Sequence, residues 1–390
     1  MSNASISTIG KVIRGVSWDK DDAIDKPRPD YLPILRAGNI SSDLNTKSDL
    51  VWVPSTNVSA DQRMRSGDIA ICMSSGSPAV VGKTASAVAD WPGSVGAFCA
   101  IIRANPEKCL PEYLAFFLKS ARFRKWTSEA QGANIKNIKK SALEDFEIWL
   151  PFLPEQRRIV DLLSRAEGIV RLRREAEKKA AELIPALFLY MFGDPATNPK
   201  GWPVKSLGQH VGIPSVVRTP DIATEAGLLC IGADSIESKS GKLISMPTVG
   251  DVLPKSGKYW FDADDVLYSK IRPYLAKATL AHTWGYCSAD MYPLRCEPTL
   301  RPIFLLSLLL CKAFTEYATA ESVRVSMPKL NREALFKYQV PVPPVDLQAI
   351  FSEQADAMQS IQSQQFAATA KAQATFDALL AQVFSGNHAE

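Results

Sequence analysis

The stretch Leu150-Pro151-Phe152-Leu153-Pro154-Glu155-Gln156 returns later in the chain as Val342-Pro343-Pro344-Val345-Asp346-Leu347-Gln348. Each copy places prolines before a long run with helical spacing, and each copy ends on a glutamine. Proline pre-sets the chain direction at the start of a helix but would break its interior, so both copies predict a helix start. Gln348 follows Gln156 by 192 residues, and this separation organises the whole chain.

The same separation holds without a gap from position 135 to position 192. Upstream it drifts to 197 for Asp68 and Asp265 and to 198 for Ile9 and Leu207, as loop insertions would cause. Each half therefore has a variable part of about 150 residues and a regular part of about 40, which predicts a gene duplication. A duplication with structural meaning only is the alternative to a functional one. The pairs separated by 192 are Ile135 and Met327, Ile138 and Leu330, Leu143 and Leu335, Phe146 and Tyr338, Ile148 and Val340, Leu187 and Leu379, and Phe192 and Phe384.

Length and composition favour a folded protein with at least two domains. The chain has 390 residues, 46% of them hydrophobic and 22% charged, which excludes disorder as its main state. Its richest apolar run, Ile303 to Leu310, is far shorter than the roughly 18–20 residues that span a bilayer. A net charge of +4 permits a polyanionic partner without requiring one.

Cysteine and histidine usage argues against a metal site. No two cysteines form a C-x-x-C pair, and the chain has only three histidines. We therefore expect neither a metal nor another cofactor, and we interpret the scattered thiols as free cysteines in a reducing cytoplasm. The cysteines are Cys72, Cys99, Cys109, Cys230, Cys287, Cys296 and Cys311, and the histidines are His210, His282 and His388.

The variable parts predict short strands separated by turns, with one helical stretch in each half. Together these elements predict a mixed α+β class. The expected strands are 68–73 and 98–103 in the first half and 266–271 and 291–295 in the second, and the expected helical stretches are 111–126 and 301–320.

The regular parts predict two helices of about 50 Å, each with one apolar seam. A helix of this length with a narrow seam needs a partner, and the other copy is the nearest one, so we expect an antiparallel intrachain coiled coil. Two helices that pack separately on other subunits are the alternative. Pro185 should kink or fray the end of the first helix. The expected seams are Ile159, Leu162, Ala166, Ile169, Ala176, Ala180, Leu183 and Leu187, and then Phe351, Met358, Ile361, Ala368, Ala372 and Leu379.

The doubled pattern resembles the specificity (S) subunits of type I restriction-modification enzymes. The resemblance is carried by Leu150 to Val160, by its echo Val342 to Ile350, and by Leu187 to Gly193 leading into Trp202 to Gly208. It covers essentially the whole chain in the expected order. The second copy departs from the family pattern, since it has Asp346-Leu347-Gln348 where the family usually has a glutamate before the glutamine.

The resemblance implies two target-recognition domains, residues 1–150 and 194–341, that read the two halves of a split site in double-stranded DNA. It implies that the helices, residues 151–193 and 342–390, are a spacer and a docking surface for two methyltransferase subunits. Motor-nuclease subunits would join the complex for restriction. A 50 Å helix approaches one and a half turns of B-DNA at roughly 34 Å per turn, which suits a fixed spacer.

The chain is expected to be non-catalytic. Gly76 to Thr84 is the nearest match to a phosphate-binding loop, but it has five residues between the glycines where such a loop needs four, and Pro78 removes one amide. No Asn-Pro-Pro-aromatic or Asp-Pro-Pro-aromatic tetrad for base methylation occurs, and the three histidines offer little acid-base chemistry. A surface turn is the expected structure of the glycine-bounded segment.

DNA reading requires polar and basic side chains presented at a groove, and both halves place such residues at matched positions. Solvated loops with no ligand are the alternative. A second alternative is a duplicated coiled-coil scaffold that binds proteins. The missing motifs argue against a third hypothesis, an autonomous methyltransferase or nuclease. The drifting separation in the variable parts predicts that the two halves recognise different sequences. The candidate DNA-binding residues are Ser74, Ser75, Ser77, Lys83, Gln131, Asn134, Lys136, Asn137, Lys139 and Lys140 in the first half and Ser269, Lys270, Arg272, Tyr274, Arg324, Ser326, Lys329 and Asn331 in the second.

Overall fold

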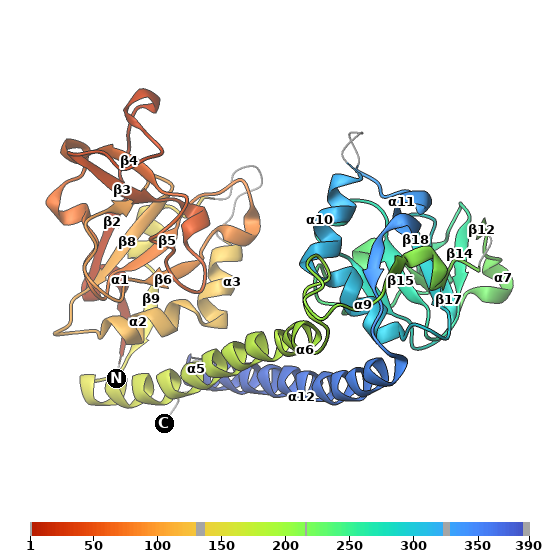
Figure 1. Cartoon of the computed structure of the whole chain (residues 1–390). Coiled ribbons are helices and arrows are strands. Elements are labelled where there is room, and N and C mark those ends of the chain that lie inside the picture. The colour runs from red at the N-terminus through yellow and green to blue at the C-terminus, as the bar shows by residue number, and fades with distance from the viewer. Residues whose placement is uncertain (1, 130–136, 215–216, 323–327, 385–390) are drawn as a thin grey trace. The chain divides into compact units, whose positions relative to one another are not determined.

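The computed structural model describes residues 2–129, 137–214, 217–322 and 328–384, and the chain divides into two compact units (Figure 1). Unit 1 comprises Met1–Arg173 and Thr369–Glu390, and unit 2 comprises Arg174–Ala368. Both unit boundaries fall inside long helices. Each unit therefore combines one α+β body with segments of two helices that are distant in sequence.

Unit 1 is built around a four-stranded antiparallel sheet with the order β2-β8-β5-β6. Its strand β5 is apolar throughout because each face lies in a different core: Ile69 and Ile71 face one, and Ala70 and Cys72 face the other. A second sheet has the order β4-β3-β7, and β1 pairs with β9. The strands are β1 (Ser2–Ser5), β2 (Gly10–Arg14), β3 (Tyr31–Leu35), β4 (Val51–Pro54), β5 (Ile69–Cys72), β6 (Thr84–Ser86), β7 (Ser94–Val95), β8 (Cys99–Ala104) and β9 (Glu147–Leu150).

Unit 2 repeats this plan with the sheet order β11-β18-β15-β16. Strand β15 again divides its side chains between two cores, with Val266 and Tyr268 in one and Leu267 in the other. A second sheet has the order β12-β14-β17-β13, and β10 pairs with β19. The strands are β10 (Val204–Ser206), β11 (Val211–Gly212), β12 (Val217–Arg218), β13 (Leu229–Ile231), β14 (Lys258–Phe261), β15 (Val266–Ser269), β16 (Ala278–Leu280), β17 (Gly285–Ser288), β18 (Met291–Cys296) and β19 (Gln339–Pro341).

The predicted strands are confirmed as β5, β8, β15 and β18, but each predicted helical stretch is a pair of helices. The Ser120 hydroxyl accepts the amide of Phe123 and so begins a new helix, and the Cys311 sulfur accepts the amide of Phe314 in the same way. The second pair is bent by 64°. The shorter helices are α1 (Ile6–Ile9), α2 (Pro111–Leu118), α3 (Ala121–Glu129), α4 (Lys140–Glu144), α7 (Ile222–Glu225), α8 (Val249–Val252), α9 (Pro302–Leu310), α10 (Lys312–Ala320) and α11 (Arg332–Lys337).

The regular parts form α5 (Leu153–Ala181), α6 (Leu183–Phe192) and α12 (Val345–Phe384). The first helix is interrupted at Glu182 because Pro185 has no amide to donate to Ala181 and its ring crowds that carbonyl. The expected kink at Pro185 is therefore confirmed. No single helix within the described ranges has both the length and the apolar composition to cross a membrane, although the bent pair α9 and α10 together meets that test.

The predicted seam of the first helix is correct at Ile159, Ala166, Ala180 and Leu187, which are buried or pack on a core, and wrong at four other positions. Leu163 and Val170 are buried in unit 1, whereas the predicted Leu162 and Ile169 are 41% and 54% exposed. Ala176 and Leu183 are exposed as well. In α12, Phe351 is buried as expected, and Ile361 is exposed. The helix carries two apolar stripes, and periodicity cannot tell which of them the protein body covers.

Candidate nucleic-acid interface

Three segments of unit 1 meet just beyond the end of β5. The amides of Met73 and Ser74 both donate to the Phe98 carbonyl, at 2.8 and 3.0 Å. The Ile138 amide donates to the Met73 carbonyl at 2.8 Å, and Ser74 forms a β-bridge with Asn137. Backbone hydrogen bonds therefore hold the predicted polar segments around Ser74 and Asn137 together, with Phe98 beside them.

Unit 2 builds the same arrangement beyond β15. The Lys270 amide donates to the Asp290 carbonyl at 3.0 Å, and the Leu330 amide donates to the Lys270 carbonyl at 2.8 Å. Ile271 and Lys329 form the matching β-bridge. Each of these groups of three hydrogen-bonded segments is called a reading frame, a structural name that has nothing to do with codons. The frame of unit 1 consists of residues 73–74, 98 and 137–138, and the frame of unit 2 consists of residues 270–271, 290 and 329–330. The duplication thus preserves a hydrogen-bonding scheme as well as a sequence pattern.

The two reading frames present different side chains. Around the first, Asn137 is exposed and Phe98 is 70% exposed, while Ser74 is half-buried. Around the second, Arg272, Tyr274 and Lys329 are exposed. Arg272 has a φ of 49°, and its amide donates to the Pro328 carbonyl at 2.8 Å. The first frame offers an amide and an aromatic ring, and the second offers cations and a phenol.

An ion pair with a buried carboxylate precedes the reading frame in each unit. Arg103 donates through Nε to Asp68 at 2.7 Å, and Arg295 donates through Nε to Asp265 at 2.8 Å. Both carboxylates are almost fully buried, and these contacts raise the pKa of each arginine. Since each pair joins the start of the central strand to the neighbouring strand, it fixes the strand from which the frame extends.

Several predicted side chains have roles inside the protein. Ser269 is buried and donates to the Ile271 carbonyl at 3.3 Å. Lys270 is buried and donates to the Ala289 carbonyl, and burial, reinforced by nearby Lys329, lowers the pKa of Lys270. The Asn331 side chain caps α11 by accepting the Ala334 amide at 2.7 Å. These findings correct the prediction that Ser269 and Lys270 are free to reach a groove, whereas Asn331 is exposed and stays a prediction.

The remaining predicted residues of the first half are spread around the frame. The Ser75 hydroxyl accepts the Ser77 amide at 3.1 Å. Lys139 is exposed before α4, and Lys140 pairs with Glu144 at 3.4 Å. Lys83 lines a separate cavity. The predicted residues Gln131, Asn134, Lys136, Arg324 and Ser326 lie outside the described residues.

Three residues near the candidate sites, Phe98, Lys119 and Arg124, were not predicted from the sequence pattern. The sequence pattern predicts Phe98 as the first residue of a buried strand, but the structure places it in the turn before β8, where it is exposed. Lys119 and Arg124 lie at the end of α2 and on α3, where cations are usually interpreted as a solvated face. Nothing in their local pattern indicates that both line the same cavity as Lys83.

The repeated glutamines join each long helix to its unit. Gln156 is fully buried; its Oε1 accepts the Leu110 amide at 2.8 Å, and its Nε2 donates to the carbonyls of Lys108 and Pro151. Gln348 makes the equivalent contacts with the Arg301 amide and the carbonyls of Thr299 and Pro343. The motif glutamine is therefore a structural clamp, which explains why it recurs at the same separation.

These features define a duplicated protein in which two related bodies carry matched frames with different side chains. Residues 4–182 match the model of the type I restriction modification DNA specificity domain. This match confirms the resemblance predicted from the sequence. Specificity subunits of type I restriction-modification systems are non-catalytic, which agrees with the prediction of a non-catalytic chain.

Named relatives agree with this assignment. The StySPI specificity subunit of Salmonella potsdam is 43% identical over 188 residues, covering 48% of this chain and 39% of the relative. The EcoKI specificity subunit of Escherichia coli K12 is 42% identical over 162 residues, covering 41% and 34%. The EcoDI specificity subunit of Escherichia coli is 27% identical over 300 residues, covering 68% and 66%. The chain thus spans well under half the length of the first two relatives that it matches.

Solved structures show the same fold over nearly the whole chain. A chain from a structure of type I restriction-modification complex assembly matches with a TM-score of 0.58 and 20% identity, covering 99% of this chain and 98% of that one. The S subunit from M. genitalium matches with a TM-score of 0.51 and 15% identity, covering 98% and 96%. The mixed α/β class with long helices is therefore confirmed.

Proposed function

We propose that this chain is a DNA specificity subunit that reads a bipartite target, one half-site with each reading frame. The observation that carries the proposal is that the two frames share the same pattern of backbone hydrogen bonds but present different side chains. A shared backbone presents each reader in the same way, and different side chains recognise different bases. In unit 1 the proposal rests on Ser74, Asn137 and Phe98, and in unit 2 on Arg272 and Lys329.

The proposed spacer is an antiparallel pairing of α5 and α6 with α12. Within unit 1, Leu163 and Val170 share a core with Phe376 and Leu380 near the end of α12. Within unit 2, Phe188 and Phe192 of α6 pack on Phe351 near the start of α12, with ring centroids 5.9 and 5.2 Å apart. There Gln362 also donates to the Ala180 carbonyl at 2.7 Å. These contacts support the division into recognition domains 1–150 and 194–341 and spacer helices 151–193 and 342–390.

The proposed partners of the helices are two methyltransferase subunits, joined by motor-nuclease subunits where restriction occurs. The stripe that the unit bodies leave uncovered supports docking, because exposed large apolar side chains recur along it. A long helix with a second apolar stripe is typical of a surface that another protein covers. The exposed apolar residues of these helices are Leu162, Ile169, Leu172, Leu183, Leu189, Tyr190, Ile350, Ile361 and Phe366.

Methylation mapping tests the proposed function. The full chain is co-expressed with its methyltransferase partner in a host without other methylation, and methylated bases are mapped across the genome. We expect one bipartite motif, which should lose its dependence on one half-site when Arg272 and Lys329 are both replaced by alanine. Methylation without any motif, or none at all in the presence of the partner, would favour the scaffold alternative.

A further inference from the structure

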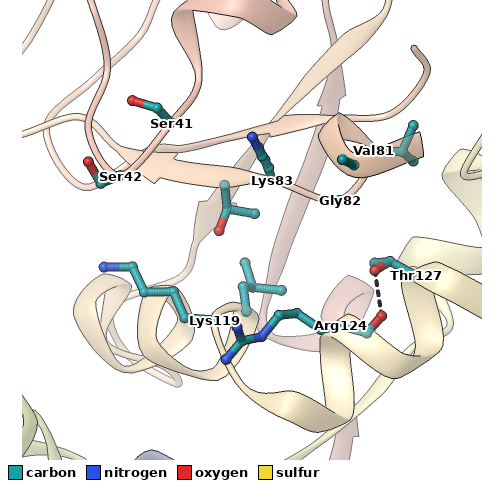
Figure 2. Close-up of a pocket in the computed structure, with 11 residues that line it drawn as sticks. Ser41, Ser42, Val81, Gly82, Lys83, Lys119, Arg124 and Thr127 are labelled. Carbon is teal, nitrogen blue, oxygen red and sulfur yellow. Dashed lines mark hydrogen bonds between the residues drawn. The ribbon is translucent and has the colours of Figure 1, made fainter. Parts of the chain in front are cut away.

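Unit 1 contains a cavity of about 420 Å³ that the reading frame does not use (Figure 2). One wall is the turn before β6 together with the loop after Asn39, and the opposite wall is formed by α3 and the end of α2. Figure 2 shows Ser41, Ser42 and Lys83 on the first side and Lys119, Arg124 and Thr127 on the second. Three cations from three separate segments therefore line one cavity.

The charge of this cavity is only partly compensated. Its described lining residues include three cations and no carboxylate. Lys119 pairs with Glu167 of α5 at 2.7 Å and lies 5.5 Å from the centre of the Phe116 ring. Within the described ranges, neither Lys83 nor Arg124 has a salt-bridge partner. Cations gathered without carboxylates repel one another unless an anion neutralises them.

The turn that carries Lys83 is held rigidly against α3. Gly82 has a φ of 83°, and a Cβ there would lie 2.8 Å from the Thr127 side chain, so only glycine allows this close approach. The Gly82 amide donates to the Cys72 carbonyl at 2.9 Å, and the Lys83 amide donates to the Val80 carbonyl at 3.2 Å. The Thr127 hydroxyl, which is buried, donates to the Arg124 carbonyl at 2.9 Å. Backbone contacts thus fix the wall before any ligand arrives.

We propose that this cavity binds a phosphate group through Lys83, Lys119 and Arg124, with the Thr84 hydroxyl as a further donor; the Ser41 and Ser42 hydroxyls donate to Asp43 instead. Ammonium, guanidinium and hydroxyl groups are the side chains that proteins use for phosphate oxygens. Gly82-Lys83-Thr84 continues into β6 rather than into a helix, so the amides of a helix N-terminus, on which a nucleotide-binding loop relies, do not follow it. Binding of the phosphate group therefore depends on the three cationic side chains.

The phosphate could come from the DNA backbone or from a free phosphate compound. The DNA source rests on the proposed function, and one contact favours it. Cys72, which exchanges hydrogen bonds with Gly82 and Lys83, immediately precedes Met73 of the reading frame. A phosphate seated beside Lys83 would then flank the bases that the frame reads. Such a contact raises affinity for all sequences and positions the duplex without discriminating between bases.

The test compares Lys83→Gln and Arg124→Gln, singly and together, with a matched control, Lys125→Gln. Lys125 lies next to Arg124 on α3, carries the same charge and does not line the cavity. Binding of the full chain to a 30-base-pair random-sequence duplex is measured by fluorescence anisotropy between 50 and 250 mM salt. A calorimetric titration with inorganic phosphate forms the second arm. Thermal melting verifies that each variant is folded.

If the phosphate belongs to DNA, the double variant should lower the slope of log affinity against log salt by about one, because one phosphate contact is lost. The control should keep the wild-type slope, and inorganic phosphate should not bind. Phosphate binding that only the cavity variants abolish, with an unchanged slope, would assign a free phosphate compound instead. An unchanged slope without phosphate binding overturns the inference. If the wild-type chain itself fails to bind DNA, the proposed function fails instead.

Discussion

Replacing Gln156 with leucine should destabilise unit 1 strongly, because the side chain is fully buried and all its polar atoms are paired. Leucine has a similar volume but leaves the Leu110 amide and the carbonyls of Lys108 and Pro151 without this partner. An unsatisfied buried polar group costs about 1–3 kcal/mol. The amide loses its acceptor, and both carbonyls lose a donor. We therefore expect a loss of roughly 3–5 kcal/mol, a large part of the roughly 5–15 kcal/mol by which a domain is stable.

Urea unfolding combined with amide hydrogen exchange measures this effect in each unit. Gln156→Leu should raise exchange in unit 1, and Gln348→Leu should do so in unit 2, because each glutamine clamps a helix onto a different unit. Gln354→Leu is the control, since Gln354 is exposed on α12, and it should change the free energy of unfolding by no more than about 0.5 kcal/mol. If Gln156→Leu costs no more than this control, the clamp does not stabilise the fold and the argument fails.

Three further changes test the helix face, the reading frame and a buried histidine. Leu163→Ser should lower the free energy of unfolding by about 2–5 kcal/mol. Leu162→Ser, one position away and 41% exposed, should leave the free energy of unfolding nearly unchanged and weaken methyltransferase capture. Equal losses of stability in the two variants would contradict the assigned helix face. Phe98→Ala should keep the melting temperature and weaken DNA binding several-fold in an anisotropy titration; unchanged affinity would remove Phe98 from the frame. Burial lowers the pKa of His210 in the folded protein, so on acidification the unfolded chain binds this proton at a higher pH than the folded chain does. The stability of the fold should therefore fall as the pH drops below about 6.5. The urea midpoints at pH 7.5 and 5.5 should differ less in His210→Asn than in the wild type.

The sequence pattern predicted the central strands well because their surroundings are simple. Ile69 to Cys72 and Val266 to Ser269 are almost entirely apolar, and both faces of each strand are indeed covered by cores. The helical pairs were harder to predict. Ser120 and Cys311 start second helices through one hydrogen bond each, and a polar residue inside an apolar helical pattern does not by itself reveal such a cap.

The candidate site was predicted only in part. Ser74, Asn137 and Lys329 were selected as polar loop residues, and the structure brings each of them to a reading frame through a β-bridge. Ser269 and Lys270 had the same polar character but are buried, because they continue β15 into the protein. Residue type alone cannot distinguish these cases. The direction of a side chain depends on strand register and on which neighbours cover it.

The sequence by itself determined the duplication, the helix starts at the paired prolines and the glutamine that recurs after 192 residues. These are local or periodic properties, and any copy of the motif carries them. Only the tertiary structure decided that Phe384, at the end of α12, packs against Tyr113 and Phe117 in unit 1, while Phe192 packs against Phe304 in unit 2. Each unit is completed by a helix end distant in sequence, because an apolar side chain is stabilised by whichever surface buries it and its spacing along the chain does not specify that surface.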